Sequence, residues 1–324
     1  MTGDARWMGA AIALGERGRG RTAPNPNVGC VIVADERVAG RGWTQPGGRP
    51  HAEQMALDEA GDAARGATAY VTLEPCCHAS SRGPACADLL AHSGILRVVA
   101  ALQDPDPRVA GGGFERLRAA GIAVEAGAGA EAAARSMAGF LIRQRLRRPQ
   151  ITLKLALSLD GKIALPSGES RWITGEDARS HVHLERARAD MVLVGRGTYE
   201  ADKPKLDVRL PGMEERSPRR ALLTRGEPVE GWTRLSRPED VFDLADVNDL
   251  LVEGGSATAS AFLAADLVDR LLIYRAPILI GEGKSSVGYI GLTSLADAHG
   301  RWRLADELRL GIDRLEVYER EREA

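Results

Sequence analysis

The chain has 324 residues, a net charge of −2 at neutral pH and four cysteines. So few cysteines do not suit a disulfide-stapled secreted scaffold, and a charge near zero gives no general attraction to nucleic acid. No apolar run reaches the roughly eighteen residues that a membrane-spanning helix needs. We therefore expect a cytoplasmic protein, with enough length for two domains of ordinary size.

Helix and strand patterns alternate through the first half. In chain order they predict a helix at Trp7–Arg17, a strand at Val28–Ala34, a helix at Ala52–Ala60, a strand at Thr68–Leu73, a helix at Ala85–His92, a strand at Ile95–Leu102, a helix at Phe114–Ala120, a strand at Ile122–Glu125 and a helix at Glu131–Leu146. Such alternation with short connections is typical of a layered α/β domain.

A basic segment, Arg143–Gln150, closes this half. We interpret it as a solvated helix end, since cations are favourable at a helix C-terminus. The proline at its end indicates a boundary, which gives predicted domains of residues 1–146 and 150–324.

The second half restarts with a strand. Its predicted elements are a strand at Ile151–Leu157, a helix at Glu176–Ala189, strands at Met191–Val194, Arg220–Leu223 and Leu250–Val252, a helix at Thr258–Ala264, a strand at Leu267–Ala276 and a final strand in the charged tail "RLEVYERERE". Residues 210–249 give only a weak pattern.

Three of the four cysteines lie within "EPCCHASSRGPAC", Glu74 to Cys86. Upstream, "HAE" places His51 and Glu53 at the start of a predicted helix. One histidine and two cysteines form a three-ligand zinc set, which leaves the fourth position for water. His51, Cys76 and Cys86 are therefore candidate ligands.

Glu53 lies two residues beyond the candidate ligand His51, where it can move protons between that water and a substrate. The order H-x-E, then P-C, then C is the signature of zinc nucleobase deaminases. Cys77 and His78 are rival ligands, although adjacent cysteines seldom bind one metal, so we assign Cys77 to packing or to contact with a ligand. The alternative is a closed structural zinc site, which would leave Glu53 without a role.

Several stretches of the first half resemble those of a known enzyme family. "PNPNVGCVIV", "HAE", "VTLEPC" and the widely spaced second cysteine are similar to the deaminase half of the bifunctional riboflavin-biosynthesis enzymes. Those enzymes join a diaminohydroxyphosphoribosylaminopyrimidine deaminase to a 5-amino-6-(5-phosphoribosylamino)uracil reductase.

The resemblance implies a cytidine-deaminase-like three-layer domain that binds Zn²⁺ through His51, Cys76 and Cys86 and transfers protons through Glu53. It also implies that Asn25 lies beside the base, where a planar amide offers a donor and an acceptor together. The substrate would be 2,5-diamino-6-(5-phosphoribosylamino)pyrimidin-4-one.

Two glycine patterns in the chain do not qualify as dinucleotide-binding fingerprints. "GAGAEA" lacks the acidic residue expected about twenty positions later, and "GRGTYEA" lacks the third glycine. "EGGS", by contrast, follows a strand and opens a helix. Its glycines allow close approach to free N–H groups, which suits a cofactor phosphate, although an ordinary strand-to-helix turn would look the same.

Three longer stretches of the second half resemble the reductase half of the same family. They are "KLALSLDGKIALPSGESRWITG", "VGRGTYEADKPKLDVR" and "LVEGGSATASAFLAADLVDRLLIYRAPILIGEG". The resemblance implies a dihydrofolate-reductase-like fold that uses NADPH. It places the cofactor at Ala156, Trp172, Thr198, Asp202, Gly254, Gly255 and Ser256, and the substrate at Ser170, Arg186, Lys205, Leu206, Arg209 and Glu253.

Two other functions remain open on the sequence. A nucleic-acid-editing deaminase would share the zinc site but needs a basic surface with stacking aromatics. Residues 1–149 carry 18 basic and 15 acidic residues, and aromatics form 4% of the chain, so this reading is disfavoured. A zinc-stabilised binding protein is the second alternative. We expect a small-molecule substrate, no nucleic-acid or membrane partner and, by resemblance, a homo-oligomer.

Overall fold

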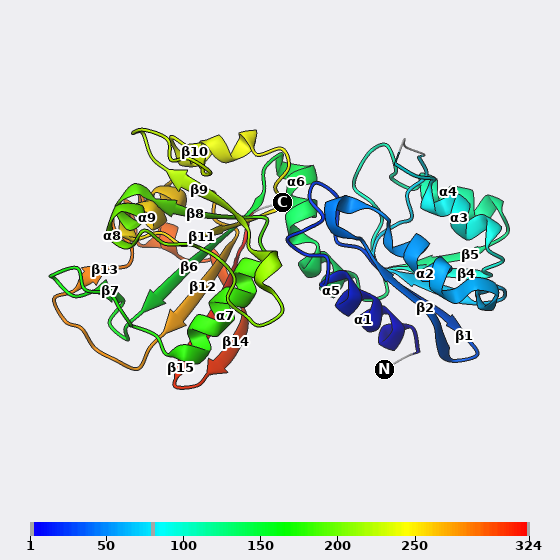
Figure 1. The fold of residues 1–324 in the computed structure, drawn as a ribbon, viewed down its shortest axis with the longest axis horizontal. Helices are drawn as coiled ribbons and strands as arrows, with labels where there is room; N and C mark the ends of the chain where they lie inside the picture. Colours follow the sequence, from blue (N-terminus) through cyan, green and yellow to red (C-terminus); the bar gives the residue numbers. More distant parts are fainter. Residues whose placement is uncertain (1–2, 79–81, 323–324) are drawn as a thin grey trace. The chain divides into compact units, whose positions relative to one another are not determined.

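A computed structural model describes residues 3–78 and 82–322 of the chain. It divides into two compact units, Met1–Arg147 and Arg148–Ala324, each of which is an α/β fold (Figure 1). Within the described residues no helix combines the length and the apolar character that crossing a membrane requires.

The first unit contains one five-stranded sheet and its helices. In chain order the elements are α1 (Gly3–Gly15), β1 (Gly29–Ala34), β2 (Arg37–Trp43), α2 (Ala52–Ala60), β3 (Thr68–Val71), α3 (Cys86–His92), β4 (Arg97–Ala100), α4 (Gly112–Ala119), β5 (Ala123–Ala126), α5 (Ala130–Ser136) and α6 (Ala138–Leu146). The strand order is β2-β1-β3-β4-β5, with β1 antiparallel to both its neighbours and β3, β4 and β5 parallel.

Glycines let a helix approach each face of this sheet closely. A Cβ on Gly29 of β1 would lie 1.8 Å from the carbonyl oxygen of Ala11 in α1. A Cβ on Gly42 of β2 would lie 2.1 Å from the carbonyl oxygen of Ala52 in α2. Gly42 pairs with Cys30, the residue after Gly29, and successive residues of a strand face opposite sides. Helices therefore cover both faces, which makes three layers.

Two predictions for the first unit were wrong in detail. Strand β2 was missed because Gly40 and Gly42 occupy its buried positions, so no apolar side chains alternate there. The single helix expected at Glu131–Leu146 is two helices, α5 and α6, separated by Met137 with φ −105° and ψ 20°.

The second unit contains an eight-stranded sheet and a small two-stranded one. Its elements are β6 (Gln150–Leu157), β7 (Lys162–Ala164), α7 (Glu176–Ala187), β8 (Met191–Gly195), α8 (Arg196–Asp202), β9 (Arg219–Leu223), β10 (Thr233–Leu235), β11 (Asp249–Val252), α9 (Ser256–Ala264), β12 (Arg270–Arg275), β13 (Lys284–Ser285), β14 (Trp302–Leu310) and β15 (Asp313–Arg320). Helix α8 and strands β7, β10, β13 and β14 were not predicted. Most positions of β14 are exposed, so this strand adds little to the core.

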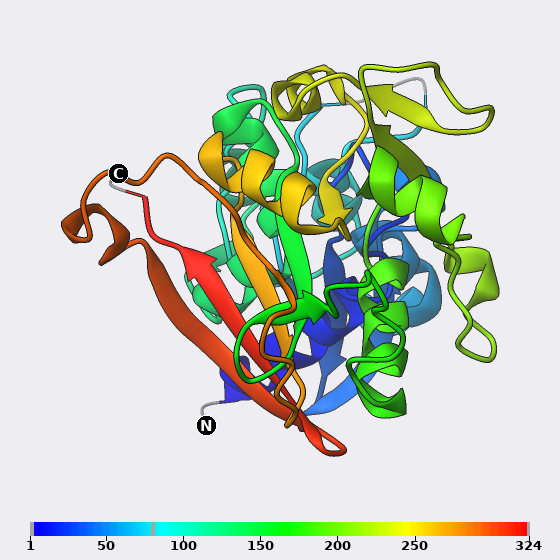
Figure 2. The same cartoon turned by 90° about the vertical axis from the view of Figure 1, so that its left-hand side faces the viewer.

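The large sheet has the order β10-β9-β8-β11-β6-β12-β15-β14, parallel as far as β12 and antiparallel beyond it. Each face of this sheet packs against a separate hydrophobic core. The neighbouring residues Leu250 and Leu251 of β11 point to opposite faces, so Leu250 belongs to the first core and Leu251 to the second. Phe262 of α9 belongs to the first core and Val182 of α7 to the second. Figure 2 shows these two helices on opposite faces of the sheet.

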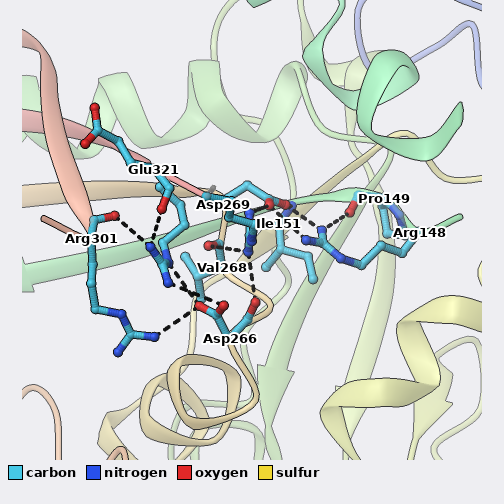
Figure 3. A network of polar contacts seen from close by, with 10 residues as sticks. Arg148, Pro149, Ile151, Asp266, Val268, Asp269, Arg301 and Glu321 are labelled. Carbon is cyan, nitrogen blue, oxygen red and sulfur yellow. Dashed lines mark hydrogen bonds and ion pairs between the residues drawn. The ribbon is translucent and has the colours of Figure 1, made fainter. Parts of the chain in front are cut away.

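A buried ion network joins the ends of three adjacent strands in this unit (Figure 3). Arg148 donates two hydrogen bonds to the carboxylate of Asp269, at 2.6 and 2.9 Å. Asp269 also accepts the backbone N–H of Ile151 at 2.9 Å and a bond from Arg322. The network therefore fixes the start of β6, the start of β12 and the segment after β15 in one register.

Candidate active sites

Three side chains of the first unit converge as a metal site requires. His51 caps the N-terminus of α2, Cys76 follows β3, and Cys86 is the first residue of α3. Their ligand atoms lie within 4.8 Å of one another, and His51 Nδ1 is 3.3 Å from Cys86 Sγ and 3.7 Å from Cys76 Sγ. One imidazole nitrogen and two sulfurs match the donor set of an open zinc site.

The thiol groups of Cys76 and Cys86 shift each other's pKa in opposite directions. The hydrogen bond between them lowers the pKa of Cys76 and raises the pKa of Cys86. The backbone N–H of Cys86 also donates to Cys76 Sγ at 3.3 Å. Cys77 points elsewhere, since its Sγ lies 3.5 Å from the carbonyl oxygen of Arg108. Residues 79–81 of the intervening segment lie outside the described residues.

Glu53 lies in the first turn of α2 and lines the same cavity as His51 and Cys76. Only 3% of its surface is exposed, and burial raises the pKa of its carboxyl group. Asn25, on the loop before β1, also lines the cavity. Its Nδ2 donates to the carbonyl oxygen of Gly48 at 3.0 Å and lies 3.4 Å from His51 Nε2. The carboxyl group of Glu53 and the amide of Asn25 therefore line the same cavity.

This cavity has a volume of about 260 Å³, enough for a small planar ring. Sequence reasoning missed several of its acidic residues. Glu74 accepts the backbone N–H groups of Asp104, Gly111, Gly113 and Phe114, at 2.9–3.2 Å, and so holds the 104–114 segment as one wall. The position of Glu74 next to Pro75-Cys76 could have indicated in the sequence that it lies near the candidate metal site. Burial raises the pKa of Asp104 to about 6.

In the second unit, one partly buried ion pair joins two of the predicted substrate residues. Arg186 of α7 donates to the carboxylate of Glu253, which follows β11, at 2.6 and 2.9 Å. Arg186 also donates to the carbonyl oxygen of Asp207 at 3.1 Å. Burial alone would raise the pKa of Glu253, yet the charges of Arg186 and of Lys154 on β6 lower it. Lys154, missed in the sequence, has its own pKa lowered by burial.

The predicted cofactor residues form a second group in this unit. The N–H of Gly255, the N-cap of α9, donates to Thr198 Oγ1 at 3.3 Å. Ser256 begins α9, and a Cβ on Gly254 would lie 2.4 Å from Thr258, so a close approach requires glycine there. Ala156 is half-buried in β6.

Most of the remaining predicted residues are exposed, and Leu206 is buried. Trp172 is 67% exposed, and the guanidinium of Arg179 stacks 4.6 Å from its ring. Asp202 pairs with Arg171 at 2.8 Å, which links the end of α8 to the Trp172 loop. Leu206 is buried with a positive φ of 55°. Ser170, Lys205 and Arg209 are exposed, and Ser170 and Lys205 take no part in the hydrogen-bonded groups just described.

Comparisons with known proteins agree with both halves. Residues 1–102 match the zinc-binding region of cytidine and deoxycytidylate deaminases, and residues 149–242 and 241–313 match the RibD C-terminal domain. The riboflavin biosynthesis protein RibD of Escherichia coli is 41% identical over 91% of this chain and 94% of its own length. The Mycobacterium tuberculosis protein is 39% identical over 95% of both chains.

Solved structures match along the whole length as well. RibD of Acinetobacter baumannii has a TM-score of 0.89 and 37% identity, covering 99% of each chain. A Thermotoga maritima diaminohydroxyphosphoribosylaminopyrimidine deaminase/5-amino-6-(5-phosphoribosylamino)uracil reductase also has a TM-score of 0.89, with 32% identity over 98% of this chain. These matches confirm the expected fold class, a cytidine-deaminase-like domain followed by a reductase domain. The chain therefore belongs to the RibD family of bifunctional deaminases and reductases of riboflavin biosynthesis.

Proposed function

We propose that residues 1–146 deaminate 2,5-diamino-6-(5-phosphoribosylamino)pyrimidin-4-one with Zn²⁺, and that residues 150–324 reduce the ribosyl side chain of the product to ribityl with NADPH. The observation that carries the first half is the convergence of His51, Cys76 and Cys86 beside the buried Glu53. The second half is supported by the match to the RibD C-terminal domain and by the Arg186–Glu253 pair.

His51, Cys76 and Cys86 would hold the zinc ion. In such a site zinc lowers the pKa of water to roughly 7, so that hydroxide is available at neutral pH. Glu53 takes the proton from the attacking water and delivers it to the departing nitrogen, which leaves as ammonia. A carboxyl group whose pKa is raised by burial suits this role because it holds the proton between the two transfers. Asn25 would hold one edge of the base through its amide.

In the second unit NADPH would supply a hydride to C1′ of the opened ribosylamine. Gly254 and Ser256 at the start of α9 would offer backbone N–H groups to a cofactor phosphate, while Thr198 accepts the N–H of Gly255 and holds that glycine, whose missing side chain allows the phosphate to approach. Arg186, Arg209 and Glu253 would contact the substrate. The remaining cofactor contacts proposed are Ala156, Trp172 and Asp202, and the remaining substrate contacts are Ser170, Lys205 and Leu206.

Product analysis tests both halves in one experiment. The purified zinc-loaded protein is incubated with the diaminopyrimidinone ribosyl phosphate, with and without NADPH. The deaminated product should form in both reactions, and the ribityl product only with NADPH. Deamination without NADPH oxidation would overturn the reductase half, and the absence of both products would overturn the proposal. A cytoplasmic homo-oligomer is expected from the family resemblance, and light scattering of the purified protein tests its oligomeric state.

A further inference from the structure

The segment that follows β3 packs closely against the 104–114 segment, which forms one wall of the deaminase cavity. A Cβ on Gly113 would lie 2.0 Å from the carbonyl oxygen of Pro75, and a Cβ on Gly112 would lie 3.0 Å from Cys77 Sγ. Pro75 and Cys77 flank one of the candidate metal ligands. The wall therefore lies directly on the part of the chain that would hold the metal, with no room for a side chain at Gly113.

Glu74 is the polar anchor of this contact. Its two carboxyl oxygens accept four backbone N–H groups of the wall, at 2.9–3.2 Å, and three of these belong to the N-terminal end of α4. A carboxylate has about four lone-pair sites, so these bonds use its acceptor capacity. Only 3% of the surface of Glu74 is exposed. Glu74 is thus placed to hold the wall, with no acceptor left for a substrate.

The first residue that Glu74 holds is Asp104, whose carboxyl group lines the cavity. Asp104 Oδ1 accepts the backbone N–H of Asp106 at 2.9 Å, which fixes the orientation of the carboxyl group. Its other oxygen, Oδ2, has no hydrogen-bond partner within residues 3–78 and 82–322. Asp104 is 8% exposed, and a buried acceptor without a partner is costly. Asp104 Oδ2 is therefore an acceptor for whatever occupies the cavity.

Asp104 also lies near the candidate metal site. Burial is the main cause that raises its pKa to about 6, and the charges of Glu74 and Cys76 raise it further. The carboxyl group is therefore ionised at pH 7.5. A diaminopyrimidinone carries amino groups and a ring N–H, and an ionised carboxylate accepts hydrogen bonds from such donors.

We propose that Glu74 is a positioning residue of the deaminase. It fastens the 104–114 segment to the segment that carries Cys76, so that Asp104 Oδ2 meets an N–H group of the pyrimidine while the ring lies at the metal site. This inference rests on the proposed deaminase function. It adds a residue that sets the affinity for the ring without touching the substrate.

The test measures KM and kcat for deamination without NADPH at pH 7.5, in the zinc-loaded wild type, Glu74→Gln, Asp104→Asn and the double variant. The amide in Glu74→Gln turns an NH₂ group toward N–H groups of the wall, which displaces it. Asp104→Asn keeps the acceptor for the Asp106 N–H but places an NH₂ group where Oδ2 faced the ring. A hydrogen bond to a charged group is worth about 10- to 100-fold, so each single variant should raise KM by that factor.

The double variant shows whether Glu74 acts through Asp104. If it does, the two substitutions are not additive, and the KM of the double variant should be close to that of the more strongly affected single variant. Two effects on KM that multiply would overturn the inference. Glu59→Gln is the control, because Glu59 also accepts a backbone N–H, from Arg41, yet is not among the described residues that line the cavity. It should keep the KM of the wild type.

The split between KM and kcat separates positioning from a general loss of structure. A partly unfolded domain would lower kcat and the zinc content and leave KM unchanged, and that result would overturn the inference. If Glu74→Gln does not fold, Gly112→Ala tests the same contact. Its methyl group would press on Cys77 Sγ and should raise KM, and Cys77→Ala in the same chain should restore it. An unchanged KM in Gly112→Ala would then overturn the inference.

The wild type distinguishes this inference from the proposed function. An inactive wild type would overturn the proposed function and this inference with it. An active wild type together with an unchanged KM in a folded Glu74→Gln protein would overturn this inference alone.

Discussion

The two candidate sites differ in how they balance their buried acids. In the first unit, burial raises the pKa values of Glu53 and Asp104. In the second unit, the pKa of the buried Glu253 is lowered, because Arg186 and Lys154 supply positive charge beside it. A bound cation would therefore offset the buried acids of the first site. In the second site, Arg186 and Lys154 supply the positive charge.

This difference shows in the spacing of the functional residues along the chain. A metal demands a few ligand atoms at fixed distances, and His51, Cys76 and Cys86 supply them within 36 residues. The contacts proposed for a nucleotide and a sugar phosphate are many, and they are spread over β6, α7, α8, the residue after β11 and the start of α9. The first kind of site can be recognised from local spacing, whereas the second needs the order of the whole domain.

The largest expected effect separates the two chemistries. Glu53→Gln should reduce deamination by about 10²- to 10⁴-fold, the usual contribution of a positioned proton carrier. Reduction of separately supplied deaminated product should be unchanged, since Glu53 belongs to the first unit. Zinc content measured by atomic absorption should also be unchanged. Loss of zinc together with activity would show that Glu53 is needed for the metal site itself.

The second prediction compares two arginine–carboxylate pairs within the second unit, one buried and one partly buried. Arg148→Met leaves Asp269 short of one partner, and Arg186→Met does the same to Glu253. Each should lower the free energy of unfolding by about 3 to 5 kcal/mol, measured by urea denaturation. At a temperature where both variants are folded, only Arg186→Met should lose NADPH oxidation.

The control for this comparison is an exposed pair in the same unit. Arg219 and Asp246 lie 2.6 Å apart with about half of each side chain in solvent, so Arg219→Met should cost under about 1 kcal/mol. If Arg148→Met costs no more than Arg219→Met, the network of Figure 3 does not stabilise the unit.

Particular residues show which parts of the fold and of the candidate sites could be predicted from the sequence. The convergence of His51, Cys76 and Cys86 could be predicted because the chemistry proposed for them tolerates few substitutes and their order is specific. Strand β2 was hidden by Gly40 and Gly42, which are buried without side chains. Arg143 looked like part of a solvated run, because its neighbours are arginines too and only the fold turns it toward a cavity. The role of Lys154 depends on Arg186 and Glu253, which are distant in sequence.

The opposite pKa shifts predict opposite pH dependences. Asp104 has a folded pKa of about 6, above its unfolded value, so its stabilising contribution is full below about pH 4 and lost as the pH rises through 6. Glu253 has a lowered pKa, so its contribution is lost as the pH falls. Asp104→Asn keeps the acceptor for the Asp106 N–H and should raise the free energy of unfolding by about 2 kcal/mol at pH 7.5.

The measurement is urea unfolding of the metal-free wild type and variant between pH 4.5 and 7.5. Because Glu53 titrates in both proteins, the difference between their free energies of unfolding reports on Asp104 alone. A difference that does not grow with pH would mean that Asp104 is ionised in the folded state. Adding zinc should shrink the difference, because a cation in the cavity favours the ionised carboxylate.

The smallest expected effect lies at the start of α9. Thr198→Val keeps the shape of the side chain but removes the oxygen that accepts the Gly255 N–H. A single hydrogen bond of this kind is worth about 1 kcal/mol, so the KM for NADPH should rise about fivefold, with little change in kcat. Steady-state NADPH oxidation measures it, and deamination in the same preparation serves as the control. An unchanged KM would place the cofactor away from Gly255. A fall in kcat with an unchanged KM would mean that Thr198 orients the reacting groups, so that the contact belongs to the chemistry of the second site and not to cofactor binding.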